Sequence, residues 1–269
     1  MSRIEYAFIG AGKKATAIAL GLRKSGVAAE SIRAYDVSPA AAKAFSAATG
    51  VQTSGTMAEA LAGAEKVILA VKPQFAAEAL AEAKACLDGK LLISIAAGLT
   101  IQWLSEHAGM KRIVRVMPNT PALAGEGMSC YAGAPGIAES DLEAAGAVLK
   151  SVGRARLVSE SQLDAVTGLS GSGPAYVMEF ILGLADGGVY CGLPRALAME
   201  MAVQTVLGTA KMCRESGQSV SDLRDAVISP AGTTARGILA LQKAGFKGTV
   251  SEAVIAGAER SAELGGKKG

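Results

Sequence analysis

Short continuous apolar runs alternate with stretches of helical period along the first 160 residues. The apolar runs are bounded by Gly, Pro or polar residues, as expected of strands buried on both faces of a parallel sheet. These runs are Ile4–Ile9, Ile32–Tyr35, Lys66–Ala70, Leu91–Ile95 and Ile113–Met117. The stretches of helical period between them are Lys14–Ser25, Pro39–Thr49, Thr56–Ala62 and Gln74–Leu87. The alternation predicts a doubly wound α/β sheet over residues 1–160, which Ser129–Tyr131 and Ala155–Val158 extend at its far edge.

Beyond residue 160 the strand pattern disappears and only helical periodicity remains. Pro174 and Pro194 stand where prolines open helices, and Gly217, Gly245 and Gly265 stand where helices end. The predicted helices are Leu163–Gly168, Pro174–Tyr190, Pro194–Glu215, Val220–Val227, Thr233–Ala244 and Val250–Leu264. The sequence therefore predicts a second, all-α domain over residues 161–269.

A glycine-rich loop follows the first predicted strand and opens the first predicted helix. Its sequence, Gly10-Ala11-Gly12-Lys13-Lys14-Ala15, fits the pattern G-x-G-x-x-A. In this context Gly10 permits the tight turn, and Gly12 lets backbone N–H groups approach a pyrophosphate at the helix N-terminus. The loop predicts dinucleotide binding by a Rossmann-like domain, through Gly10, Ala11, Gly12, Lys13 and Lys14. The alternative is an ordinary tight turn between a strand and a helix.

Asp36 ends the second predicted strand, where an acidic residue usually accepts a hydrogen bond from the ribose 2′-OH of NAD and repels the 2′-phosphate of NADP. Four other polar residues complicate this inference. Ser38 and Lys43 lie nearby in the sequence, and Lys13 and Lys14 stand on the loop itself. The sequence therefore predicts NADP or NAD as the cofactor and leaves the choice between them open.

Ligands of such sheets bind at the carboxyl ends of the strands, and three of these ends are unusual. The small residues at two of them leave room for the cofactor ribose and nicotinamide. Asn119 follows the strand that ends at Met117 and stands between two prolines, which suits it to position an amide or a ribose hydroxyl. The candidate cofactor-binding residues at these strand ends are Ala70, Val71, Lys72, Pro73, Ala96, Ala97, Gly98 and Asn119.

Composition and charge narrow the classes of function. The chain has 33 glycines among 269 residues, 50% hydrophobic residues and a net charge of +3, which excludes a disordered chain and predicts no nucleic-acid partner. Its single histidine, His107, is remote from every motif, and its four cysteines have no zinc spacing, so no metal site is expected. Without a signal segment or a run long enough to cross a membrane, we expect a cytoplasmic protein without a membrane partner.

Two motifs of the helical half carry the most specific sequence signal. They are Gly168-Leu169-Ser170-Gly171-Ser172-Gly173-Pro174-Ala175-Tyr176 and Ser229-Pro230-Ala231-Gly232-Thr233-Thr234. Together with Val116–Pro121, they closely resemble the pyrroline-5-carboxylate reductases over essentially the whole chain. The resemblance implies reduction of 1-pyrroline-5-carboxylate to L-proline with NADPH or NADH, the final step of proline biosynthesis. It also implies a homo-oligomer: a dimer through the helical domain, in some members assembled into decamers.

The resemblance assigns the substrate to the second motif and to one acidic residue. The backbone N–H groups of Gly232, Thr233 and Thr234 would form a carboxylate cradle at a helix N-terminus. Thr234, which the family places beside the ring nitrogen, is the candidate catalytic residue, although both threonines suit plain N-caps as well. Glu160 matches an acidic residue that the family places near the substrate; the alternative is a surface or capping acid.

The β-hydroxyacid dehydrogenases are the main enzymatic competitor, since Gly168, Gly171 and Gly173 match their glycine spacing. Their Lys and Asn positions are Val177 and Phe180 here, and alcohol oxidation needs a general base that this helix does not offer. A protonated imine is already electrophilic, so its reduction mainly needs orientation and a hydrogen bond. A reductase of the six-membered cyclic imino acid and a non-enzymatic dinucleotide sensor are further alternatives.

Three positions depart from the family pattern. The family loop usually has Asn-Met or Gln-Leu where this chain has Lys13-Lys14. An Asn that the family often has in the cofactor-facing turn after its own third strand is Met57 here. The usual Glu-Thr-Gly-x-His-Pro reads Glu215-Ser216-Gly217-Gln218-Ser219-Val220. The first two departures concern cofactor preference and affinity, and the third concerns a turn between helices near the subunit interface.

Overall fold

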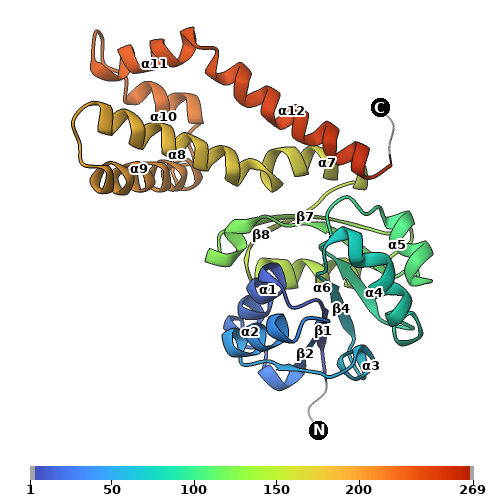
Figure 1. The fold of residues 1–269 in the computed structure, drawn as a ribbon. Helices are drawn as coiled ribbons and strands as arrows, with labels where there is room; N and C mark the ends of the chain where they lie inside the picture. Colours follow the sequence, from blue (N-terminus) through green and yellow to red (C-terminus); the bar gives the residue numbers. More distant parts are fainter. Residues whose placement is uncertain (1–3, 267–269) are drawn as a thin grey trace. The chain divides into compact units, whose positions relative to one another are not determined.

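The computed structural model describes residues 4–266, so the outermost residues of the two predicted domains (1–3 and 267–269) lie outside the described part. Its internal contacts form two compact units. One unit contains the chain up to Ser172 and again from Ile255 onward, and the other contains Gly173–Val254. We describe each unit by itself (Figure 1).

The first unit is built on one eight-stranded sheet with the strand order β3-β2-β1-β4-β5-β6-β7-β8. All neighbouring strands run parallel except β6 and β7, which pair antiparallel. The first six strands therefore have the order of a doubly wound dinucleotide-binding fold, with its switch point between β1 and β4. The strands are β1 Tyr6–Ile9, β2 Ile32–Tyr35, β3 Gln52–Thr53, β4 Lys66–Leu69, β5 Leu91–Ser94, β6 Ile113–Met117, β7 Gly127–Gly133 and β8 Gly153–Leu157.

Helices cover both faces of this sheet. Buried side chains of α1, α2 and α6 pack on one face, and those of α3, α4 and α5 pack on the other. All four residues of β1 and all four of β5 are buried, which explains why these strands are continuous apolar runs in the sequence. The helices of this unit are α1 Lys13–Lys24, α2 Pro39–Thr49, α3 Met57–Leu61, α4 Ala76–Ala83, α5 Ile101–Ala108, α6 Glu139–Lys150 and α7 Leu163–Val166.

The predicted doubly wound sheet is confirmed, and β2 and β6 have the predicted bounds. Three elements were not predicted: the helices α5 and α6 and the two-residue strand β3. The bounds of α5 are nevertheless visible in the sequence. The Thr100 side chain accepts a hydrogen bond from the Trp103 N–H at the start of α5, and Gly109 ends it with φ of 69°.

The predicted helix Leu163–Gly168 is shorter in the structure, because α7 ends at Val166 and passes into a π-helical turn, Thr167–Gly171. The last helix, α12, is longer than predicted, since it begins at Phe246 instead of Val250 and ends at Leu264. The far end of α12, from Ile255 onward, belongs to the first unit.

The second unit is entirely helical. It contains α8 Gly173–Tyr190, α9 Arg195–Glu215, α10 Val220–Ala226, α11 Thr233–Lys243 and the beginning of α12. Helices α8 and α9 approach closely at small residues: Ala185, Ala198 and Ala202 form the buried centre. A Cβ added to Gly188 would lie 3.2 Å from the Cβ of Ala198. The small residues of this half therefore serve helix packing.

Large apolar side chains of α8 and α9 remain exposed in the single chain. Phe180 is 38% exposed, Met178 58% and Leu207 58%. Such a surface is typical of a face that another protein surface covers. Among residues 4–266, none of the helices has the length and apolar character needed to cross a membrane.

Candidate active site

The glycine-rich loop connects β1 to α1 with the geometry that its sequence predicts. Gly10 has φ of 97°, and a Cβ added there would lie 3.0 Å from the carbonyl of Ala70, so only glycine fits this crossing of β1 and β4. Gly12 is the N-cap of α1 and makes no side-chain cap, and a Cβ added to it would meet nothing within 4 Å. The N-terminus of α1 therefore presents free N–H groups to open space, as a pyrophosphate site requires.

Asp36 follows β2 and is hydrogen-bonded to the loop itself. Its Oδ2 accepts from the Ala11 N–H at 2.7 Å, and its Oδ1 accepts from the Ser38 N–H at 2.8 Å. The carboxylate thus joins the ends of β1 and β2.

A cavity of about 520 Å³ opens beside this loop at the carboxyl ends of β1, β2 and β4. It brings together six of the predicted cofactor residues: Gly10, Gly12, Asp36, Ala70, Val71 and Lys72. The other eight predicted cofactor residues do not line it: Ala11, Lys13, Lys14, Pro73, Ala96, Ala97, Gly98 and Asn119. Its mostly apolar lining also includes Met57, which the sequence analysis connected with cofactor affinity, and two side chains that the sequence did not assign to the cofactor, Val37 and Phe75. Phe75 is 54% exposed and Val37 81% exposed, an unusual exposure that only the structure reveals.

On the other side of β4, the end of β5 leads toward a cluster of polar side chains around Glu160. The turn Ala96–Gly98 follows β5, and Gly98 has φ of 78°. A Cβ added to Gly98 would lie 3.6 Å from the Cβ of Leu264, so the end of α12 packs against this turn. The turn leads directly into α5, whose first residue is Ile101.

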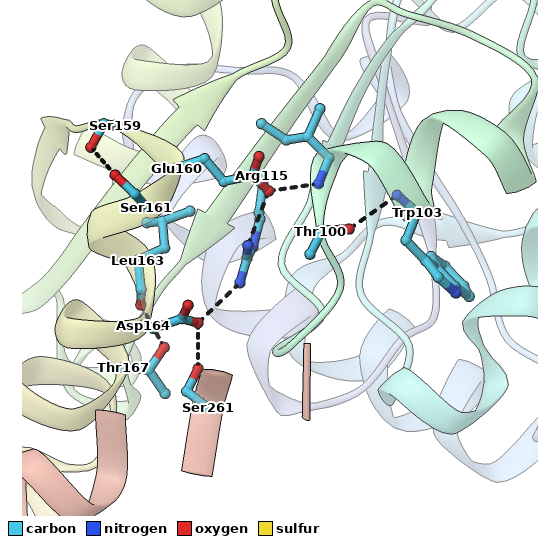
Figure 2. A network of polar contacts seen from close by, with 11 residues as sticks. Thr100, Trp103, Arg115, Ser159, Glu160, Ser161, Leu163, Asp164, Thr167 and Ser261 are labelled. Atoms are coloured by element: carbon cyan, nitrogen blue, oxygen red, sulfur yellow. Dashed lines mark hydrogen bonds and ion pairs between the residues drawn. The ribbon is translucent and has the colours of Figure 1, made fainter. Parts of the chain in front are cut away.

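Glu160 is part of a partly buried polar network around this turn (Figure 2). Its Oε1 accepts from the Ile101 N–H at 2.7 Å and from the Arg115 guanidinium at 3.0 Å. Arg115, on β6, is only 4% exposed and also faces Asp164 Oδ1 at 3.8 Å. Asp164 in turn accepts from the Ser261 hydroxyl at 2.9 Å. In this unit Glu160 therefore anchors the N-terminus of α5 and neutralises a buried cation.

Asn119 binds protein groups through both ends of its amide. Its Oδ1 accepts from the Met128 N–H at 2.8 Å, and its Nδ2 donates to the Ser170 carbonyl at 3.1 Å. A Cβ added to Gly171 would clash with the Met117 side chain. Asn119 and Gly171 thus hold the π-helical turn of the first motif against the end of β6, which gives Gly171 a packing role.

The second motif forms the N-terminus of α11, in the helical unit. Ala231 has φ of 58° and is the one non-glycine residue with positive φ among residues 4–266. Gly232 is the N-cap of α11 and provides no side-chain cap, and Thr233 and Thr234 are the first two residues of the helix. The threonines are therefore not N-caps. The motif leaves an uncapped helix N-terminus at which Thr234 is half-buried.

Two further side chains, Tyr176 of the first motif and the single histidine, have structural partners. The Tyr176 hydroxyl donates to the Ala253 carbonyl at 3.0 Å, which ties α8 to α12 within the helical unit. His107 stacks on Trp103 with ring centroids 3.7 Å apart and bonds to the Trp103 carbonyl. Within residues 4–266, no group of three or more His, Cys, Asp or Glu side chains is arranged to hold a metal ion.

A parallel sheet with a glycine-rich loop, an acid ending β2 and a cavity at its carboxyl edge defines a dinucleotide-binding α/β protein, the class that contains the nicotinamide-dependent oxidoreductases. Comparisons with known proteins narrow this class. Residues 160–264 match the family model for pyrroline-5-carboxylate reductase dimerisation, and residues 5–98 match that for NADP oxidoreductase, coenzyme F420-dependent.

Relatives match nearly the whole chain. The pyrroline-5-carboxylate reductase of Pisum sativum is 42% identical over 96% of this chain and 94% of its own length. That of Methanosarcina acetivorans is 43% identical over 99% of this chain and 100% of its own. The crystal structure of the Plasmodium falciparum pyrroline carboxylate reductase with NADP bound has a TM-score of 0.88 at 36% identity, covering 98% of this chain and 99% of that one. The chain belongs to the pyrroline-5-carboxylate reductase family.

Proposed function

We propose that this chain reduces 1-pyrroline-5-carboxylate to L-proline with NADPH or NADH, the last step of proline biosynthesis. The observation that carries the proposal is the uncapped N-terminus of α11, which follows the strained turn at Ala231. Its free N–H groups and helix dipole favour a small carboxylate, and a helix N-terminus left without a side-chain cap is open to such a ligand. Family membership makes the ring carboxylate of the imino acid the natural occupant.

The cofactor site fits a dinucleotide by the same physical criterion. The N-terminus of α1 has no side-chain cap, and the space in front of Gly12 is open. When bound, the dihydronicotinamide supplies the hydride. We assign cofactor binding to the loop, the acid after β2 and the three strand ends: Gly10, Ala11, Gly12, Lys13, Lys14, Asp36, Ala70, Val71, Lys72, Pro73, Ala96, Ala97, Gly98 and Asn119.

The role of this chain's residues in the reaction is to hold and polarise the substrate. The free N–H groups of Thr233 and Thr234 bind the carboxylate at the N-terminus that Gly232 begins. The Gly232 N–H itself donates to the Ser229 carbonyl at 3.0 Å in the structure, so Gly232 takes part through its position and not through a free N–H. The substrate reacts as the protonated imine. As hydride reaches the imine carbon, the π electron pair of the C=N bond moves to the ring nitrogen, which keeps its proton and becomes a neutral amine whose lone pair accepts a hydrogen bond. Thr234 then donates its hydroxyl hydrogen bond to that nitrogen, and no general base is needed. Glu160 remains assigned to the substrate region, where its proposed part is to hold the end of the β5–α5 turn.

Domains and assembly belong to the same proposal. Residues 1–160 are the dinucleotide-binding domain and residues 161–269 the helical domain that forms the dimer. The exposed apolar side chains of α8 and α9 support this interface, because a monomer rarely exposes them. Further assembly into decamers follows from the resemblance, and the cytoplasmic location stays a prediction from the sequence. Analytical ultracentrifugation distinguishes the dimer from the decamer, and fractionation of cells tests the compartment.

The experiment that tests the proposed function compares substrates. Purified protein is supplied with the five-membered imino acid or with its six-membered homologue, and kcat/KM is measured with both dinucleotides. We expect the five-membered ring to give the higher kcat/KM and L-proline as the product. Turnover of neither ring with either dinucleotide would refute the proposal, and preference for the six-membered ring would change its substrate.

A further inference from the structure

The carboxylate of Asp36 is fixed in place by the backbone. One oxygen accepts from the Ala11 N–H at 2.7 Å and the other from the Ser38 N–H at 2.8 Å. Rotating the side chain away would break two charge-assisted hydrogen bonds at once, and these are the strong kind. A side chain held in this way keeps its negative charge at the end of β2 and does not move aside for a ligand.

The segment that follows Asp36 has little left with which to bind a phosphate. The N–H of Ser38 donates to Asp36, and Pro39 at the start of α2 has no N–H. The Ser38 hydroxyl accepts from the Ala41 N–H and caps α2. The N-terminus of α2, which would be a ready anion site if it were uncapped, is therefore largely occupied by protein groups.

The charges around Asp36 also disfavour a bound 2′-phosphate. The cavity of about 520 Å³ is lined by three carboxylates, Asp36, Glu78 and Glu82, against the single ammonium of Lys72. Lys13 and Lys14 begin α1, where the pyrophosphate common to both dinucleotides would bind, so they do not distinguish NADH from NADPH.

Lys43 is the one cation that lines the hollow on the other side of Asp36, which has a volume of about 770 Å³. It is an exposed side chain of α2. An exposed ammonium is strongly hydrated, so its attraction for a phosphate is weak compared with the repulsion of a fixed carboxylate beside the ribose.

We propose that Asp36 selects NADH over NADPH in this chain: it accepts hydrogen bonds from the adenosine ribose hydroxyls and excludes a 2′-phosphate. The inference rests on the proposed dinucleotide site and goes beyond it, because the family resemblance allows either cofactor. Because hydrogen bonds from the Ala11 and Ser38 N–H groups fix the Asp36 carboxylate, the preference for NADH follows from the folded backbone.

The test is a binding titration of the purified protein with NADH and with NADPH, followed by dinucleotide fluorescence without substrate. We expect NADH to bind at least about tenfold more tightly, equivalent to about 1.4 kcal/mol. Asp36→Asn removes the charge and should reduce the NADH/NADPH ratio at least about fivefold, mainly through tighter NADPH binding. Asp88→Asn is the matched control, since it makes the same change at an exposed site on another edge of the sheet and should leave the ratio unaltered.

Three other outcomes would contradict either the selection by Asp36 or the dinucleotide site itself. Equal or tighter binding of NADPH by the parent protein would overturn the selection by Asp36 while leaving the proposed function intact. A selective loss of NADPH binding in Lys43→Ala, with NADH unaffected, would show that Lys43 holds a 2′-phosphate and would also overturn it. Binding of neither dinucleotide would instead refute the dinucleotide site itself. The parent titration alone decides the question should Asp36→Asn fail to fold.

Discussion

Replacing Arg115 by methionine removes the central cation of the network in Figure 2 while keeping a long apolar side chain. The Arg115 side chain is 5% exposed, and its loss removes the guanidinium that two carboxylates share. Of these, Asp164 has a side chain 13% exposed and Glu160 one 33% exposed. Breaking a buried ion pair from one side typically costs about 3–5 kcal/mol. Because Glu160 is partly hydrated, we expect the lower end, about 3 kcal/mol of the free energy of unfolding.

The assay is urea unfolding followed by the fluorescence of Trp103, the single tryptophan of the chain. It suits this network because Trp103 lies on α5, and Glu160 holds the first N–H of that helix. Protein concentration is kept constant, since unfolding of an oligomer depends on it. The matched control is Arg260→Met, which breaks a pair whose side chains are 66% and 58% exposed and should cost at most about 0.5 kcal/mol. A cost for Arg115→Met below about 1 kcal/mol, close to the control, would refute the reasoning.

Three further substitutions separate binding, catalysis and structure. Gly12→Val should weaken dinucleotide binding at least about tenfold without lowering stability, because the added side chain enters open space at the N-terminus of α1; titration and thermal unfolding measure the two effects, and unchanged affinity would contradict the loop assignment. Thr234→Ala should lower kcat/KM by a factor equivalent to about 1–3 kcal/mol of transition-state stabilisation, as expected for a lost hydrogen bond to the ring nitrogen. An unaltered kcat/KM in steady-state assays would show that Thr234 has only a structural role. Glu160→Gln should lower the free energy of unfolding by about 1–2 kcal/mol, because Arg115 keeps Asp164 as a partner; a rise in KM at unchanged stability would instead favour direct contact between Glu160 and the substrate.

Local sequence patterns predicted the elements whose formation depends on residues close together in the chain. Buried parallel strands such as β1 and β5 are continuous apolar runs, and the loop Gly10–Gly12 needs glycine for steric reasons that hold wherever such a loop occurs. The helix α5 was missed because it is short and carries polar residues between its buried positions, although Thr100 and Gly109 mark its ends.

Long-range pairing was not predictable in the same way. The sequence pattern gives Arg115 only as a charged residue within an apolar strand, and its partner Glu160 lies 45 residues further on. The partners Asp164 and Ser261 are 97 residues apart. Asn119 was predicted to position an amide or a ribose hydroxyl, yet its amide binds Met128 and Ser170. The contact with Ser170 depends on how the π-helical turn packs against β6. Contacts between distant segments follow from the assembled fold, and no local pattern encodes them.

The most direct test of the proposed reduction is product formation by the purified protein from 1-pyrroline-5-carboxylate and reduced dinucleotide. We expect one L-proline to form for each dinucleotide oxidised, and we expect the rate to be strongly reduced in Thr234→Ala. Dinucleotide that stays reduced in the presence of the imino acid, or oxidation without L-proline, would contradict it.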